Sequence, residues 1–255
     1  MNGIKLISTG SAVPKKVVTN DDLAKIVDTN DEWISTRTGI RSRRYCTDGE
    51  SHTSLCLAAA RQALERGGVA PGEIGICLVA TVTPDFLSPA AACLLQKELG
   101  FPEDTICFDL NAACSGFLYG TAVARGLLAT LGGRYALVIG TEALSRLMDP
   151  ADRSTCVLFG DGAGAAVFEL TDTSAPFAIT LGARGDAAIH AGGPSRAGSA
   201  PISMDGRAVF RFAVDALPKC LHTVLDETGL TLDNLDWVVC HQANSRIIDQ
   251  VQYRV

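Results

Sequence analysis

The sequence contains no Cys-x-x-Cys pair, only four histidines and no apolar run long enough to cross a membrane. Its nine cysteines, an odd number without paired spacing, argue against a zinc site or a disulfide framework and favour a reducing compartment. A bilayer-spanning helix needs about 20 apolar residues, and Lys5 interrupts the only apolar stretch at the N-terminus. We therefore expect a cytoplasmic protein with no metal site and no membrane contact.

Positive charge is also in short supply. The chain has 22 lysines and arginines against 28 aspartates and glutamates, a net charge of −6, which argues against general nucleic-acid binding. Its 255 residues, 47% of them hydrophobic, suffice for one large domain or two modest halves.

Strand-like apolar runs alternate with helical patterns along the first part of the chain. Strands are predicted at residues 4–9, 74–81, 105–109, 135–140 and 164–169, and helices at 51–66, from Pro89 to 100 and at 114–131. This βαβα order predicts an α/β fold with a mostly parallel sheet.

A polar stretch at 170–176, which ends in Pro176, predicts a boundary between two halves. In the second half, the pattern predicts strands at 177–183 and 237–240, a loop at 192–201, and a helix at 205–228 that Pro218 kinks.

Two strand-to-helix junctions carry chemically reactive side chains. Cys114 stands where a predicted strand gives way to a small-residue helix, and the unpaired N–H groups of a helix start lower the pKa of a thiol. His241 occupies a similar junction, where we expect the helix dipole to keep the imidazole neutral. Together they suggest acyl transfer through a cysteine nucleophile and a histidine.

Seven motifs spread over the whole chain give it a resemblance to a known family. In chain order they are Gly10-Ser-Ala-Val-Pro14, Asp31-Glu-Trp-Ile34, Thr36-Arg-Thr-Gly-Ile-Arg41, Asn111-Ala-Ala-Cys-Ser-Gly116, Asp149-Pro150 with Asp152-Arg153, Phe159-Gly-Asp-Gly-Ala-Gly164 and His241-Gln-Ala-Asn244. Their order and joint occurrence resemble 3-oxoacyl-acyl carrier protein synthase III, a condensing enzyme of the thiolase-like superfamily.

The resemblance implies a fold and an activity. The fold would be two duplicated βαβα halves in a layered αβαβα arrangement, residues 1–170 carrying the nucleophile and 177–255 forming the second half. The activity would be an acyltransferase that initiates type II fatty acid synthesis by decarboxylative condensation of a short acyl-coenzyme A with malonyl-acyl carrier protein. A homodimer, the coenzyme A thioester as a substrate and no further cofactor are also implied.

The resemblance also implies a role for each matching residue. Cys114 would be the acyl-accepting nucleophile, and His241 would support decarboxylation. Coenzyme A would contact Thr29, Trp33, Arg37, Arg153 and Asn244, with the adenine between Trp33 and Arg153. The acyl carrier protein would meet Gln242, Ala243, Asn244, Ser245 and Arg246.

Family members continue into a Gly-Asn-Thr-Ser turn, whose asparagine pairs with the histidine, and a glycine-rich loop that donates an oxyanion-hole N–H. The sequence stops at Val255, before either segment, so we expect the second half to be incomplete and the activity impaired. Two alternatives stay open: a non-catalytic truncated remnant, and a related thiolase-like synthase of secondary metabolism.

Overall fold

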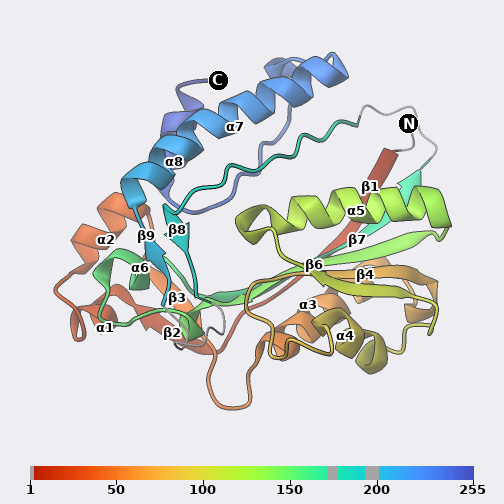
Figure 1. The fold of residues 1–255 in the computed structure, drawn as a ribbon, viewed down its shortest axis with the longest axis horizontal. Helices are drawn as coiled ribbons and strands as arrows, with labels where there is room; N and C mark the ends of the chain where they lie inside the picture. Colours follow the sequence, from red (N-terminus) through yellow and green to blue (C-terminus); the bar gives the residue numbers. More distant parts are fainter. Residues whose placement is uncertain (1–2, 172–176, 193–200) are drawn as a thin grey trace. The chain divides into compact units, whose positions relative to one another are not determined.

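The computed structural model describes residues 3–171, 177–192 and 201–255, and contacts within the chain divide it into two compact units (Figure 1). The first unit takes in the described residues among 1–16, 44–143 and 160–177, and the second takes in those among 17–43, 144–159 and 178–255. The division into duplicated halves at 170 and 177 concerns topology and stays a prediction.

A five-stranded sheet in the order β1-β7-β6-β4-β5 forms the centre of the first unit. The strands are β1 (Gly3–Ala12), β4 (Ile74–Ala80), β5 (Ile106–Leu110), β6 (Tyr135–Ala143) and β7 (Asp161–Thr171). β6, β4 and β5 pair in parallel, whereas β7 pairs antiparallel with both β6 and β1. Four strands therefore run in one direction, as the mostly parallel prediction requires, and only β7 is reversed.

Helices cover both faces of this sheet. α3 (His52–Gly67) and α4 (Ala91–Leu99) lie on one face, and α5 (Gly116–Leu131) lies on the other (Figure 1). Successive residues of β4 alternate between the two cores: Cys77 and Val79 pack with α3 and α4, and Ile76 and Leu78 pack with α5. A strand buried on both sides reads as a continuous apolar run, which is the pattern that predicted β4.

The start of α4 depends on a side chain from another element. Its N-cap residue, Ala90, offers no side-chain acceptor. Asp109 of β5 accepts hydrogen bonds from the backbone N–H groups of Ala91 at 2.7 Å and Ala92 at 2.9 Å instead. A negative charge at this position also complements the helix dipole, so the helix begins at Ala91, two residues after Pro89.

The second unit is mainly helical. It contains α1 (Asn20–Ala24), α2 (Asp31–Thr38), α6 (Arg153–Cys156), α7 (Gly206–Thr228), α8 (Ser245–Gln252) and the short pair β8 (Ile189–His190) and β9 (Ser203–Met204). The remaining elements are β2 (Lys16–Thr19), β3 (Ser42–Tyr45) and the 3₁₀ turns at Pro71–Glu73, Ala113–Ser115, Leu144–Arg146 and Leu232–Asn234. Val214 of α7 packs against Ile247 and Val251 of α8.

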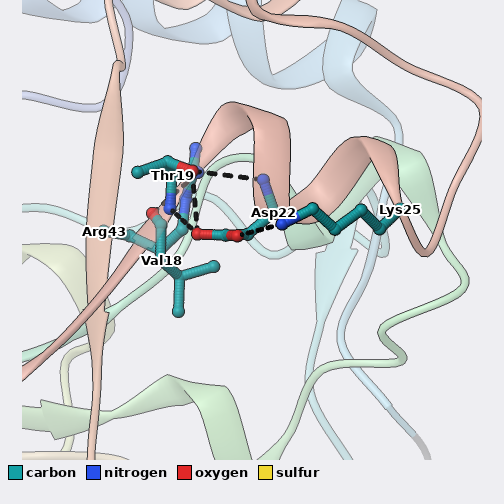
Figure 2. Close-up of polar contacts among 5 residues, drawn as sticks. All are labelled: Val18, Thr19, Asp22, Lys25 and Arg43. Carbon is teal, nitrogen blue, oxygen red and sulfur yellow. Dashed lines mark hydrogen bonds and ion pairs between the residues drawn. The ribbon is translucent and has the colours of Figure 1, made fainter.

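A reciprocal cap begins α1 (Figure 2). The Thr19 hydroxyl accepts from the backbone N–H of Asp22 at 3.1 Å, and the Asp22 carboxylate accepts from the backbone N–H of Thr19 at 3.1 Å. Lys25, 2.8 Å away, and Thr19 lower the pKa of Asp22 below its usual range. Beside the cap, the buried Arg43 donates to the carbonyl of Val18 at 3.2 Å. These contacts fix the chain just ahead of the segment that carries Thr29 and Trp33.

Two predicted strands of the second half are wrong. Residues 177–183 and 237–240 form no ladder in the part of the chain that the structure describes, and Trp237 and Val239 are 87% and 90% exposed. Apolar alternation reports only a propensity, whereas a strand also needs a hydrogen-bonded neighbour. The predicted helix at 205–228 is confirmed as α7, with Pro218 inside it. The boundary at 170–176 and the loop at 192–201 lie largely outside the described residues.

Candidate active site

A sharp turn after β5 presents Cys114. β5 ends at Leu110, and Ala113 then adopts φ of 45°, a left-handed conformation that costs a non-glycine residue roughly 1–3 kcal/mol. Cys114 lies in the 3₁₀ turn Ala113–Ser115, and α5 begins at Gly116. A Cβ at Gly116 would lie 2.9 Å from the Cβ of Ala80, so only glycine lets α5 approach the end of β4 this closely. The result is an exposed cysteine on a strained strand-to-helix connection.

The pKa of the Cys114 thiol is raised, so the prediction of a lowered pKa is wrong. Burial of the thiol is the main cause, although the residue as a whole is exposed, and the charge of Glu142 raises the pKa further. The cysteine's own backbone N–H acts in the opposite direction. Desolvation outweighs this local donor, and the α-helix itself begins two residues later than the motif suggested. The Cys114 side chain is therefore a protonated thiol at neutral pH, which would have to lose its proton before it could act as a nucleophile.

Glu142 belongs to none of the sequence motifs, and it lies near the end of β6, close enough for its charge to act on Cys114. Its carboxylate accepts hydrogen bonds from the backbone N–H of Val82 at 2.8 Å and from the hydroxyls of Thr81 at 3.3 Å and Thr83. Burial raises the pKa of Glu142, while these hydrogen bonds lower it. No motif signals the residue, because its partners are about 60 positions away in the sequence.

In the second unit, the structure brings Trp33, Arg37 and Arg153 together. The guanidinium carbon of Arg37 lies 4.6 Å from the centre of the Trp33 ring, and that of Arg153 lies 4.8 Å from it. Arg153 also donates to the carbonyl of Asp28 at 2.7 Å. Both contacts are cation–π interactions, and a separation of 4.8 Å leaves no room for an aromatic ring between Trp33 and Arg153. An adenine that stacks between these residues must first displace the Arg153 side chain.

Thr29 lies four residues before Trp33, on the segment that leads into α2. Its hydroxyl oxygen is buried and has no hydrogen-bond partner among the described residues. A buried polar atom without a partner costs about 1–3 kcal/mol, so this hydroxyl favours a ligand that supplies one.

His241 stands four residues ahead of α8, not at its first turn. The N-cap is Asn244, whose side-chain oxygen accepts from the backbone N–H of Arg246 at 2.9 Å, and this capping bond sets where the helix begins. Desolvation of the ring lowers the pKa of His241 from 6.5, although the residue as a whole is exposed, so the imidazole is neutral near pH 7. The expected protonation state is confirmed, but the cause is burial and not the helix dipole.

The start of α8 lies beside the end of α2. A Cβ at Gly39, the C-cap of α2, would lie 3.1 Å from the Cβ of Ser245. The predicted carrier-protein segment, Gln242 to Arg246, is thus a neighbour of the helix that carries Trp33 and Arg37. Cys114 belongs to the first unit and His241 to the second.

The described residues include a surface depression apart from the candidate residues, but no metal cluster and no membrane-spanning helix. A surface depression of about 570 Å³, lined by Leu64, Val69 and Leu99 among others, lies by the C-terminal ends of α3 and α4 and contains none of the candidate residues. Within the described ranges, no group of three or more His, Cys, Asp or Glu side chains could hold a metal ion. No helix of the described chain is long and apolar enough to span a bilayer.

Comparison with known proteins bears on the family of the chain. The family model for 3-oxoacyl-[acyl-carrier-protein] synthase III matches residues 108–185, the stretch that contains Cys114 and Glu142. The chain is 49% identical over 251 residues to beta-ketoacyl-[acyl-carrier-protein] synthase III of Sphingopyxis alaskensis, covering 96% of this chain and 78% of that protein. It is 42% identical over 260 residues to the enzyme of that name from Clostridium acetobutylicum, covering 98% and 79%.

Solved structures give the same result. The 3-oxoacyl-[acyl-carrier-protein] synthase III of Aquifex aeolicus superposes with a TM-score of 0.89 at 40% identity, covering 99% of this chain and 80% of that one. The Pseudomonas aeruginosa enzyme gives 0.91 at 38% identity, covering 98% and 79%. The priming beta-ketosynthase of the R1128 polyketide pathway gives 0.92 at 36% identity, covering 98% and 78%. With its thiolase-like fold, the chain therefore belongs to the beta-ketoacyl-[acyl-carrier-protein] synthase III family of acyltransferases.

Proposed function

We propose that the chain condenses a short acyl-coenzyme A with malonyl-acyl carrier protein to give 3-oxoacyl-acyl carrier protein, the first condensation of fatty acid synthesis. The observation that carries this proposal is the strained turn at Ala113, which presents a cysteine at the end of a parallel strand within the stretch that the family model matches. The curated relatives at 42% and 49% identity bear the synthase III name, whereas the polyketide enzyme is 36% identical, which favours fatty acid synthesis.

In the first half-reaction, Cys114 accepts the acyl group. The thiol loses its proton, the sulfur attacks the thioester carbonyl, and the C–S bond to coenzyme A breaks. The proton ends on the departing coenzyme A thiolate, so that the products are an acyl-cysteine and free coenzyme A. The raised pKa of Cys114 makes deprotonation part of the barrier to this step.

In the second half-reaction, malonyl-acyl carrier protein loses carbon dioxide and becomes an enolate. His241, neutral because burial lowers its pKa, donates a hydrogen bond to the enolate oxygen. The enolate carbon attacks the acyl-cysteine, the C–S bond to Cys114 breaks, and the thiolate takes up a proton. The scheme needs no resident cofactor or metal.

Coenzyme A binds on the second unit in this proposal. Trp33 and Arg153 hold the adenine after Arg153 swings away from the ring, and Arg37, Thr29 and Asn244 contact the remainder. The buried Thr29 hydroxyl and the two guanidinium groups supply one polar group and two positive charges for a phosphate-bearing ligand.

The carrier protein meets Gln242, Ala243, Asn244, Ser245 and Arg246. Arg254, two residues after the end of α8, is paired with Asp215, which leaves Arg246 as the arginine for an acidic partner. We further propose a homodimer that works in the cytoplasm, where thiols stay reduced; none of the nine cysteines is in a disulfide.

The proposal is tested by incubating the protein with acetyl-coenzyme A and then with malonyl-acyl carrier protein. We expect intact mass spectrometry to show one acetyl group on Cys114 and loss of this group when the 3-oxoacyl product forms. Cys114→Ser should show neither change, and Cys220→Ser, at an exposed cysteine of α7, should behave as wild type. Acetylation at another cysteine, or none at all, would contradict the proposal.

A further inference from the structure

Glu142 ties the segment 81–83, which follows β4, to the end of β6. Val82 donates its backbone N–H to one carboxylate oxygen at 2.8 Å, and the Thr81 and Thr83 hydroxyls donate to the other. Thr83 in turn accepts from the backbone N–H of Ala143 at 2.8 Å. One carboxylate therefore gathers three donors from three consecutive residues, and both threonine side chains are buried.

The same segment is also tied to the strand that leads into Cys114. The backbone N–H of Thr81 donates to the carbonyl of Leu110, the last residue of β5, at 3.0 Å. Gly116, two residues after Cys114, packs against Ala80, the residue just before the segment. Residues 81–83 are thus held between the carboxyl ends of β5 and β6 and form one wall beside the nucleophile's turn.

The charge of Glu142 also connects this segment with Cys114. Glu142 is the charged group that acts on the Cys114 thiol, whereas Asp85 and Asp109, the other carboxylates of this region, act with Glu142 on Cys56. Each of those two aspartates accepts from backbone N–H groups at a helix start, Asp85 from Thr53 and Asp109 from Ala91 and Ala92. Glu142 instead accepts from the segment next to the nucleophile.

We propose that Glu142 is a positioning residue for acyl transfer, whose carboxylate fixes the 81–83 wall against the Cys114 turn. This inference rests on the proposed function for its reaction but not for its geometry. The carboxylate has a second consequence, because its charge opposes formation of the thiolate. Glu142 therefore orders the turn that carries Cys114 but lowers the reactivity of the resting thiol.

The test compares Glu142→Gln with Glu142→Asp. The glutamine keeps the length of the side chain and removes the charge, so the pH midpoint for iodoacetamide labelling of Cys114 should move to lower pH. The aspartate keeps the charge but shortens the reach, so the midpoint should stay near that of wild type. Both variants should lose roughly ten- to a hundredfold in kcat for acyl transfer, because a small displacement of a reacting group costs that much. KM should change less, since the proposed coenzyme A contacts lie in the second unit.

Controls keep the test decisive. Glu98→Gln, at an exposed glutamate of α4, should leave the labelling midpoint and kcat unchanged. A folded Glu142→Gln protein with the wild-type midpoint and kcat would overturn the proposal. If that variant does not fold, Thr83→Val replaces it: a wild-type acylation rate there would overturn the proposal, and a loss restored by Thr83→Ser would support it. Alkylation needs no substrate, so a midpoint shift appears even if the chain uses another acyl donor.

Discussion

At the scale of single residues, the Trp33 ring that we propose as the adenine site is covered by side chains of the protein itself. Two arginine side chains lie against its ring, and one of them must leave before a base can stack there. The cation–π contact that is lost is worth about 0.5–1 kcal/mol at an exposed site, and stacking of a base on the ring gives about 1–3 kcal/mol. The exchange therefore favours the ligand.

We expect Trp33→Ala to weaken coenzyme A binding roughly 5- to 150-fold, the equivalent of that stacking energy. Isothermal titration calorimetry with coenzyme A measures the change. Trp237→Ala is the matched control. Trp237 is the other tryptophan of the chain, it is exposed, and it is not among the side chains that contact Trp33. Equal affinity in Trp33→Ala and wild type would remove the adenine site from the second unit.

Protonation of His241 is the second prediction at this scale. Partial desolvation of the ring lowers its folded pKa from 6.5, so between that lowered value and 6.5 the unfolded chain binds more protons and stability falls as the pH falls. We expect the His241 ring signal to titrate below pH 6.5 in NMR spectra. His241→Ala should remove that signal and flatten the change in urea midpoint between pH 6.5 and 5. A ring that titrates above 6.5 would show that the site favours the imidazolium.

At the scale of elements, β1 and α3 approach each other closely at Gly10. A Cβ at Gly10 would lie 2.1 Å from the backbone oxygen of Ala59 and 2.6 Å from the backbone nitrogen of Ala63. Neither atom belongs to a side chain that can rotate away, so a methyl group here must push the helix off the sheet. The glycine thus sets the distance at which the core residues of α3 pack.

Gly10→Ala should lower the free energy of unfolding by about 3 kcal/mol, the upper range for an overpacked core. Urea denaturation measures the loss. Gly164→Ala is the control, because Gly164 pairs opposite Ser11 in the same sheet and a Cβ there would meet nothing within 4 Å. Similar stabilities for the two variants would mean that α3 adjusts freely.

Local pattern explains which elements of the first unit could be predicted. Apolar runs predict the strands β4 and β6, and the caps Ser51 and Gly68 mark the ends of the helix α3. Each of these signals lies in neighbouring residues of the sequence. The reversed direction of β7 cannot be predicted from adjacent residues, since it depends on which strands pair. The segment 237–240 has the composition of a strand but no partner in the described chain, and it stays unpaired.

The candidate site divides in the same way. The position of Cys114 at a strand-to-helix turn follows from its motif, but its raised pKa comes from atoms packed around the thiol and from Glu142. The start of α8 shifts because the Asn244 side chain caps it. The sequence pattern does not reveal Glu142, because its three hydrogen-bond donors follow a different strand and only the folded sheet places the ends of β4 and β6 side by side.

At the scale of the whole molecule, two large apolar side chains stand exposed on the loop that follows the 81–83 wall. Phe86 is 58% exposed and Leu87 is 84% exposed. Large apolar side chains that lie together at a surface commonly mark a protein interface, and the proposed homodimer would cover them.

We expect light scattering at micromolar concentration to give twice the 26.7 kDa mass of the chain. Leu87→Asp should shift this to the mass of one chain, because association would bury an unpaired carboxylate. Leu131→Asp, which changes a similarly exposed leucine at the last residue of α5, should leave the mass unchanged. Since the 86–87 loop continues from the segment that Glu142 fixes, loss of the dimer should also slow acylation of Cys114. A monomeric wild-type protein that acylates at full rate would place the Phe86–Leu87 surface outside the function.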